Sequence, residues 1–333
     1  MKLFKRIIYL GYYISKTDWT KFRKYVRYVN QKDKISKLKL WVSPFAASIK
    51  YNISLLEYYM FRFWEKSASE RKQWAGTGFM YEYQLAMNSR KNRDLLLNKA
   101  KFLKHNAQFI THRWFCVENG DFERFRCFFE QINGKIVLKK VSGNCGIGVQ
   151  VADSSTEKIE DIISLARKNK LTLAEEYIYQ HKDLMRLSPS GLNTVRIFTQ
   201  IVGDDVVILG TRLRISVNSN VDNMAAGNLA AVIDENSGIV TQAAVYSDIT
   251  KSPETLHPVT KMEIVGFQVP LWNEIIEKVK DIALHNKENR SVGWDIAVTD
   301  MGVDFIEGNH DWCKLVYQLP VGKGLKKELQ KYV

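Results

Sequence analysis

Apolar residues recur every three to four positions from residue 1 to about residue 65, which is the spacing of amphipathic helices. Basic and aromatic side chains alternate along this segment, as in DWTKFRKYVRYV. In that stretch, Tyr25, Val26 and Val29 would share one helical face. Two interpretations stay open: the cations contact a membrane surface or a nucleic acid, or the aromatic residues pack on the body of the protein while Lys and Arg stay solvated. We favour packing.

The pattern changes from about residue 94. A helical run, DLLLNKAKFLKHNA, leads into the apolar segment QFITHRWF, and another helix is expected at 121–130. Strands then dominate, because β-branched residues stand between Gly, Asn and Asp turn signals. The predicted strands are KIVLKKV, LTLAEEYIY, NTVRIFTQIV, DVVILGTRLRISV, NLAAVIDE, GIVTQAAVY, GWDIAVT and VDFIEGN, with hairpin turns at 203–205, 236–238 and 300–302. One amphipathic helix interrupts them near 270–286, so we expect an α+β fold with antiparallel sheets.

Length and composition narrow the class of protein. The 333 residues are 45% hydrophobic, enough for a well-buried core and more than one subdomain. No apolar run reaches the roughly 18 residues that cross a bilayer, and no secretion-signal pattern is present, so we expect a protein that is not exported. The four cysteines lie far apart without a CxxC pair, which argues against a disulfide framework or a zinc site and fits a reducing cytoplasm.

Charge is distributed unevenly. Residues 1–110 hold 23 Lys and Arg against 7 Asp and Glu, a net charge of +16, whereas the remainder holds 26 against 29, a net charge of −3. The positive field is therefore confined to the first third of the chain, which we expect to face any polyanion. A nucleic-acid enzyme is disfavoured, because no recognised RNA- or DNA-binding motif accompanies the charge.

A glycine-rich loop follows the predicted strand KIVLKKV. Lys139 and Lys140 stand on the strand, and Gly143, Gly146 and Gly148 follow in the loop. Glycines let backbone N–H groups approach phosphate oxygens, and a lysine at the strand end supplies compensating charge. Because lysine precedes the glycines, a Walker loop is excluded, and without HRD or DFG triplets so is a protein kinase. An ordinary glycine-rich hairpin is the alternative.

A second candidate site lies in VGWDIAVTDMGVDFIEGNHDW. A three-residue loop, Asp300-Met301-Gly302, with Gly302 in the left-handed region would place Asp295 opposite Glu307. Because side chains alternate along a strand, Glu307 and Asn309 would then share a face with Asp295. Mg²⁺ takes such oxygen ligands together with substrate phosphates and water. We interpret these three residues as metal ligands rather than solvated strand acids.

Three arginines lie on neighbouring predicted strands: Arg196 in NTVRIF, and Arg212 and Arg214 in GTRLRIS. The last two alternate with Leu213 and so share a face. A fixed guanidinium can hold phosphoryl or carbonyl oxygens bidentately as they gain negative charge. Pairing with acids of the sheet is the alternative role.

Taken in order, these motifs carry a resemblance. Lys99, Lys139 with its glycine loop, Glu175-Glu176-Tyr177-Ile178, and Asp295 followed by Glu307-Gly308-Asn309 occur in the order seen in ATP-grasp enzymes, over about residues 94–315. More narrowly, the stretches SLLEYYMFRFWEKSASERKQW, EEYIYQH, LSPSGLNTVRIFT, GTRLRIS and GWDIAVTDMGVDFIEGN resemble the sugar-transfer-associated ATP-grasp family linked to cell-surface polysaccharide biosynthesis.

The resemblance implies a role for each matching position. Lys99 and Lys139 would contact ATP phosphates, and the segment 142–148, with Ser142, Gly143, Gly146 and Gly148, would cover them as a mobile flap. Backbone groups of Glu176 and Ile178, beside Tyr177, would read the adenine edge, and Glu175 would orient its exocyclic amine. Asp295, Glu307 and Asn309 would bind one or two Mg²⁺ ions, and Arg196 and Arg212 would join Lys139 in catalysis. The sequence departs from the family at Lys140, where a proline is usual.

The resemblance also implies an organisation and a reaction. A basic helical region, 1–93, would precede two ATP-grasp subdomains, 94–178 and 179–333, which clamp ATP between antiparallel sheets. The chain would join a carboxylate to an amine through an acyl phosphate, with an amino acid and a sugar or sugar nucleotide as substrates. A phosphotransferase and a catalytically inactive nucleotide-binding adaptor are the alternatives. The protein would be cytoplasmic, with contact between its basic region and anionic membrane or glycan-lipid left open.

Overall fold

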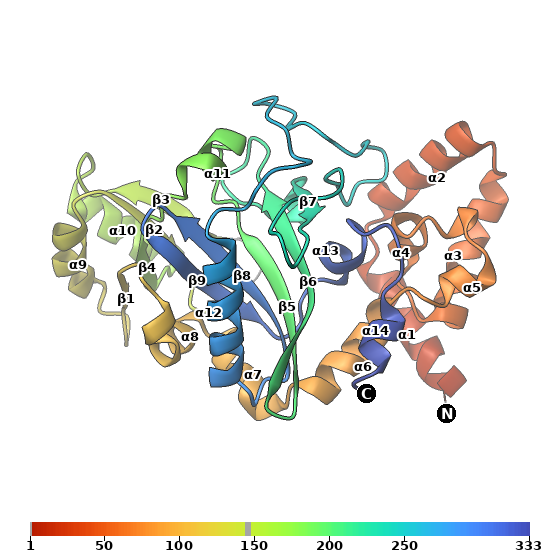
Figure 1. Cartoon of the computed structure of the whole chain (residues 1–333), viewed down its shortest axis with the longest axis horizontal. Coiled ribbons are helices and arrows are strands. Elements are labelled where there is room, and N and C mark those ends of the chain that lie inside the picture. The colour runs from red at the N-terminus through yellow and green to blue at the C-terminus, as the bar shows by residue number, and fades with distance from the viewer. Residues whose placement is uncertain (1, 144–147) are drawn as a thin grey trace.

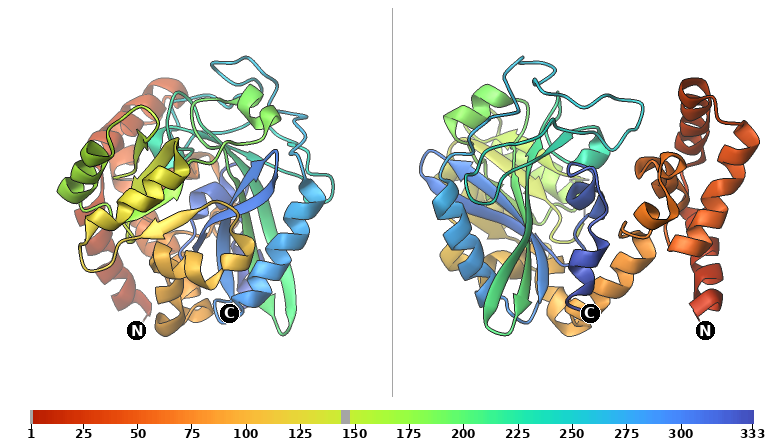
Figure 2. Two further views of the ribbon diagram at one scale, coloured as in Figure 1. Left: turned by 90° about the vertical axis from the view of Figure 1, so that its left-hand side faces the viewer. Right: turned by 45° about the vertical axis from the view of Figure 1, so that its right-hand side comes forward.

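A helical region precedes two antiparallel sheets in the computed structural model, which describes residues 2–143 and 148–333 (Figure 1). The helices of the first region are α1 Lys2–Lys16, α2 Trp19–Asp33, α3 Lys37–Tyr51, α4 Leu55–Met60, η1 Phe63–Glu65 and α5 Ala68–Arg71. They are followed by α6 Thr77–Met87, α7 Arg90–Leu97, α8 Lys99–His105 and η2 Ala107–Phe109. The helical prediction for the first 65 residues is thus confirmed. In Figure 2, α1–α5 stand at one end of the molecule, joined to the sheets through α6.

Helix α2 has a capped start and one buried face. Asp18 caps the helix by accepting a hydrogen bond of 2.9 Å from the backbone N–H of Lys21. Tyr25, Val26 and Val29 are buried on one face, as the sequence pattern predicted. For this helix, therefore, the buried residues pack on neighbouring helices while Arg23 and Arg27 are exposed, and Lys24 forms an ion pair of 2.7 Å with Asp248.

The four-stranded sheet carries the glycine loop. Its strands are β1 Trp114–Cys116, β2 Lys135–Lys139, β3 Gln150–Asp153 and β4 Leu173–Glu176, in the order β1-β4-β2-β3. The helices η3 Phe122–Arg124, α9 Phe125–Ile132 and α10 Ile159–Asn169 contribute apolar residues to the core beside this sheet. The sequence analysis anticipated α9 but missed β1, β3 and α10.

The five-stranded sheet has the order β7-β6-β5-β8-β9, with every neighbouring pair antiparallel. Its strands are β5 Val195–Val202, β6 Asp205–Ile215, β7 Leu229–Val232, β8 Ser291–Thr299 and β9 Gly302–Asn309. α12, Trp272–His285, covers one face and buries Ile275, Val279 and Ile282 in the largest core. The remaining helices are α11 Lys182–Leu187, η4 Met224–Ala226, α13 Lys314–Gln318 and α14 Lys326–Gln330. None of the described helices is long and apolar enough to cross a membrane.

The expected strand GIVTQAAVY does not form. Residues 238–246 make only isolated bridges, including Val240 to Ile233 and Val245 to Ala230. Alternating apolar residues identify a segment that is half-buried, and here the segment bridges β7 and the residue after it without forming a continuous ladder. The α+β class with antiparallel sheets is confirmed, while the division of the chain at residues 93 and 178 stays a prediction.

One buried carboxylate ties the helical region to the body. Glu57 accepts hydrogen bonds from the backbone N–H of Ser54 at 2.8 Å and from the N–H and hydroxyl of Thr77 at 3.0 and 2.7 Å. Its other contact is Lys314 of α13, with 2.9 Å between Nζ and Oε1. The side chain of Glu57 is only 3% exposed, so these partners replace the water that the carboxylate loses.

Glu57→Ala is expected to lower the free energy of unfolding by about 3 kcal/mol, because it leaves the Lys314 ammonium and two backbone N–H groups without an acceptor. Urea denaturation measures the change. The matched control is Glu65→Ala, which removes an exposed pair with Arg62 and should cost about 0.5 kcal/mol or less. Equal losses in the two variants would contradict this role of Glu57.

Candidate functional site

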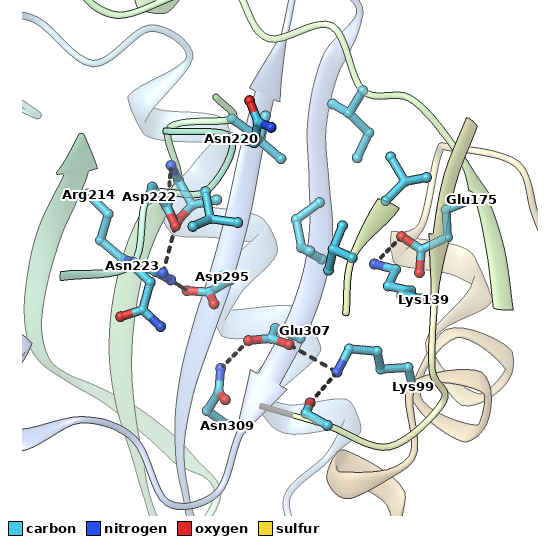
Figure 3. Close-up of a pocket in the computed structure, with 18 of the residues that line it drawn as sticks. Lys99, Lys139, Glu175, Arg214, Asn220, Asp222, Asn223, Asp295, Glu307 and Asn309 are labelled. Atoms are coloured by element: carbon cyan, nitrogen blue, oxygen red, sulfur yellow. Dashed lines mark hydrogen bonds and ion pairs between the residues drawn. The ribbon is translucent and has the colours of Figure 1, made fainter. Parts of the chain in front are cut away.

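A cavity of about 360 Å³ lies between the two sheets. Figure 3 shows Lys99, Lys139 and Glu175 on one side of it and Arg214, Asp222 and Asp295 on the other. This volume is within the range of small-molecule sites. The cavity is lined by most of the residues proposed from the sequence: Lys99, Lys139, Ser142, Gly143, Glu175, Glu176, Tyr177, Ile178, Arg196, Asp295, Glu307 and Asn309.

Strand register assembles the charged wall of the cavity. Arg196 of β5 pairs with Arg212 of β6 on one side and with Asp295 of β8 on the other, and Asp295 pairs with Glu307 of β9. Directly opposed residues of an antiparallel pair project from the same face. One row across four strands therefore holds two arginines followed by two acids, and Arg196, Asp295 and Glu307 of this row line the cavity.

Asp295 is the most constrained member of this row. It is 4% exposed and accepts from Arg196 twice, at 2.5 Å from Nε and 2.7 Å from Nη2. Arg214 adds a contact at 2.9 Å and joins Asp222 at 2.6 Å. Burial by itself raises the pKa of Asp295, but the charges of Arg196 and Arg214 outweigh burial and hold that pKa below its ordinary value. Asp295 is thus ionised in the protein interior.

Glu307 experiences the opposite balance. Burial, followed by the negative charge of Asp295, raises the pKa of Glu307, and the Lys99 ammonium only partly opposes them. Lys99 Nζ is 3.7 Å from the carboxylate, and Asn309 Nδ2 donates to it at 3.1 Å. The side chain remains 33% exposed toward the cavity, so it is accessible to a ligand. A cation placed here would relieve the repulsion between the two acids.

These residues fit a Mg²⁺ ion. Glu307 offers carboxylate oxygens, and Asn309 donates with its nitrogen, which leaves its amide oxygen as a further hard ligand. Asp295 is less available, because both its oxygens already accept from guanidinium groups. Within the described ranges, no group of three His, Cys, Asp or Glu side chains forms a metal cluster. Two acids and an amide nevertheless suit Mg²⁺, which fills its other positions with phosphate oxygens and water.

The hairpin that carries these acids reaches the predicted pairing by a different route. The turn has two residues rather than three, because Thr299 pairs with Gly302 and only Asp300 and Met301 lie between. A β-bulge then shifts the register, so that Asp295 pairs with Glu307 and the next residue pairs with Phe305. The bulged residue, Ile306, lines the cavity together with Glu307, whereas regular alternation along the strand would place Ile306 on the opposite face.

The opposite wall holds lysines beside the glycine loop. Lys99 begins α8, and its Nζ donates to the carbonyl of Gly143 at 2.8 Å. Lys139, at the end of β2, forms an ion pair with Glu175 of β4. Both members of that pair are buried, at 9% and 4% exposure. The loop thus begins between two ammonium groups, while Gly146 lies outside the described residues and Gly148 does not line the cavity.

A model of the sugar-transfer associated ATP-grasp family matches residues 79–332 of this sequence. The chain belongs to that family. The helices α1–α5 lie outside the matched residues. No curated protein sequence matches the chain.

Solved structures similar to this ATP-grasp chain include three ligases. ATP-grasp ligase PsnB in complex with its precursor peptide PsnA2 and AMPPNP is 14% identical, with 71% of this chain and 58% of that one covered and a TM-score of 0.38. D-alanine–D-alanine ligase from Helicobacter pylori is 13% identical, with coverages of 72% and 61% and a TM-score of 0.45. L-amino acid ligase from Bacillus licheniformis is 13% identical, with coverages of 66% and 41% and a TM-score of 0.40. This chain therefore spans less than two thirds of each of these proteins.

Arg212 is not brought to the cavity of the ATP-grasp protein. Its buried guanidinium donates to the carbonyls of Val316 and Tyr317, at 3.2 and 2.5 Å, and so holds α13. Burial lowers the pKa of Arg212 to about 10. Arg214, to which the family resemblance assigned no catalytic role, lines the cavity instead.

Other residues of the site escaped the sequence analysis. Asp222 lines the cavity and anchors Arg214, and Thr194 donates to it through its backbone N–H at 2.9 Å. Behind Glu175, the ring of His112 joins Asp304, at 2.7 Å from Nδ1, and approaches Glu175 to 3.7 Å with Nε2. Asp222 lies in a turn-rich segment, VNSNVDN, whose polar residues give no pairing signal.

Glu307→Gln is expected to stabilise the ATP-grasp protein at pH 7. Because the folded-state pKa of Glu307 is raised, ionised Glu307 costs stability above that pKa, and the uncharged amide removes the cost. The gain should diminish as the pH falls through the raised pKa and vanish below the ordinary pKa of 4.5, where Glu307 is protonated in both states. Urea denaturation across this pH range measures it. Glu277→Gln, at an exposed position of α12, is the control, and a pH-independent or destabilising effect of Glu307→Gln would contradict the expectation.

Proposed function

We propose that the protein is an ATP-dependent carboxylate–amine ligase that works through an acyl phosphate. The observation that carries the proposal is that lysines line one wall of a cavity whose other wall holds two arginines and two acids. These are Arg196, Arg214, Asp295 and Glu307. Such a cavity can hold a polyphosphate between fixed cations while two acids face it with room for a metal ion. Family membership supports the same assignment.

The nucleotide would lie along the four-stranded sheet. Its base would rest beside Glu175–Ile178, all of which line the cavity. The backbone N–H of Glu176 already donates to the Arg113 carbonyl at 2.8 Å, so we assign base recognition to the carbonyl of Glu176 and the N–H of Ile178. The phosphates would extend toward Lys139 and Lys99, near the start of the glycine loop.

A divalent cation would be held by Glu307 and Asn309, with Asp295 beside them. Bound there, Mg²⁺ supplies charge neutralisation of the β and γ phosphates. Asp295 also positions the guanidinium groups of Arg196 and Arg214. Both groups lie beside the space where the substrate carboxylate would bind. The fixed guanidiniums would stabilise negative charge as it develops on the transferred phosphoryl group.

The proposed reaction has two steps. A carboxylate oxygen of the substrate attacks the γ phosphorus and displaces ADP, giving an acyl phosphate. An amine then attacks the acyl carbon, phosphate leaves, and the amine loses a proton as the amide forms. Carboxylates need this activation because hydroxide is a poor leaving group, whereas phosphate leaves readily.

The substrates we propose are an amino acid and a sugar or sugar nucleotide, such as a uronic acid or an amino sugar. The family description, sugar-transfer associated, supports a sugar. Asn220, Asn223 and Asp311 also line the cavity, and their amides and carboxylate suit hydroxyl and ammonium groups. Surface-polysaccharide biosynthesis in the cytoplasm would be the setting.

Titration calorimetry of Mg-ATP tests the nucleotide site. Glu307→Gln and Lys99→Met should each weaken binding by about tenfold, or about 1.4 kcal/mol. Lys104→Met, an exposed change on the same helix as Lys99, should bind like the wild type. Because Glu307→Gln is expected to stabilise the fold, its loss of affinity cannot be ascribed to unfolding. An affinity for Mg-ATP that neither Glu307→Gln nor Lys99→Met changes would refute the assignment of these residues.

Product analysis tests the reaction. Phosphate release from Mg-ATP should require a carboxylate and an amine together, and an amide should accumulate in equal amount. Arg214→Met should reduce this rate by about a hundredfold, whereas Arg167→Met on the exposed side of α10 should not. Transfer of phosphate to a hydroxyl without any amine would identify a phosphotransferase instead, and ATP binding without turnover across a panel of acids and amines would favour an adaptor.

A further inference from the structure

Helix α1 is attached to the protein by one face only. Tyr13 is buried, and its hydroxyl donates to Asn52 Oδ1 at 3.3 Å. Two turns before Tyr13, Arg6 donates to the carbonyls of Ile49 and Lys50, at 3.1 and 3.0 Å, at the end of α3. These contacts settle which side of α1 faces the neighbouring helices.

The other face of α1 is apolar and has no partner in the structure that is described. Phe4, Ile7, Ile8 and Tyr12 are 69, 54, 55 and 56% exposed, at a spacing of three, four and eight positions that places them along one stripe. Between them, a Cβ on Gly11 would meet nothing within 4 Å. Isolated apolar residues are common on protein surfaces, but a stripe of large ones along a whole helix marks a contact site.

Charge decides what kind of surface this stripe can meet. The sequence of α1, KLFKRIIYLGYYISK, contains four Lys and Arg and no acid, and residues 1–50 contain 13 Lys and Arg against 2 Asp. A second copy would bring like charges together, which costs free energy. A nucleic acid would satisfy the cations but offers no apolar phase for the stripe. An anionic lipid surface satisfies both.

The neighbouring helix gives the same indication. α3 packs against α1 and exposes Leu38 and Val42 at 74 and 57%, within a segment that carries Lys37 and Lys39. Figures 1 and 2 place these helices at one end of the molecule, away from the two sheets. They also lie outside the residues matched by the ATP-grasp family, so their surface serves something other than the shared fold.

We propose that α1 lies in the plane of an anionic membrane interface, with Phe4, Ile7, Ile8 and Tyr12 among the upper acyl chains. The exposed side chains of Lys5 and Lys16 would meet the phosphate headgroups. The helix is 15 residues long and would rest on the membrane rather than cross it. The ligase cavity is formed by other elements, so membrane binding needs neither nucleotide nor catalysis.

Vesicle flotation with the full chain tests this proposal. The wild type should bind vesicles that contain phosphatidylglycerol, bind pure phosphatidylcholine vesicles weakly, and lose affinity as salt is raised. The triple variant Phe4→Ser, Ile7→Ser and Ile8→Ser should bind at least about tenfold more weakly. The matched control changes three exposed apolar residues elsewhere, Met301→Ser, Val259→Ser and Leu256→Ser, and should bind like the wild type.

Three results would overturn the proposal. The first is no binding of the folded wild type to the anionic vesicles. The second is equal binding of the wild type and the triple variant to the anionic vesicles. That result would mean that charge alone attracts the protein, and both proteins should then also bind a duplex oligonucleotide equally well. The third is a dimer in sedimentation velocity that the triple variant dissociates, which would identify the stripe as a self-association face. Intact Mg-ATP binding by the triple variant separates any of these results from a failure of the ligase assignment.

Discussion

An ionised carboxylate buried between two guanidinium groups organises the cavity. Taking Asp295 out of water is costly, and the cost is offset only while Arg196 and Arg214 keep their contacts with it. Because the three residues come from β8, β5 and β6, the ion cluster fixes the register of the central strands. Glu307 therefore lies next to the Asp295 carboxylate, which stays ionised and fixed in position. The raised pKa of Glu307 follows from that neighbour and from burial, and the protein maintains a strained acid pair where a metal ion would be useful.

A second buried ionic chain supports the opposite wall. Asp304 of β9 holds the ring of His112, which approaches Glu175 of β4, and Glu175 in turn pairs with Lys139 of β2. The chain therefore runs from the sheet with the acid pair to the sheet with the glycine loop. Side chains fixed in this way keep the two walls of the cavity at a set separation, which favours binding of a ligand that spans both.

The sequence predicted local patterns better than distant contacts. The buried face of α2 and the pairing of Asp295 with Glu307 were both predicted, because each follows from a short-range period. The bulge at Ile306 was not predicted, since no residue type marks it. The sequence analysis assumed a three-residue turn and a strand without a bulge, and these two errors cancel in the pairing of Asp295 with Glu307. Helix α10 was missed although IEDIISLARKN has helical spacing, because strand signals surround it. The exchange of Arg212 for Arg214 could not be foreseen: alternation places both on one face, and only the position of α13 decides which one reaches the cavity.

The bond network of Glu57 has a consequence for where this chain can be cut. The family match begins at residue 79, a natural choice for a shorter recombinant protein. Such a cut would remove Glu57 and leave Lys314, whose side chain is 20% exposed, without its carboxylate partner. It would also remove Gln73 and Trp74, whose backbone packs tightly against Gly324 near α14. The helical region and the carboxyl-terminal helices thus pack together, and a fragment that keeps these contacts must begin before Glu57.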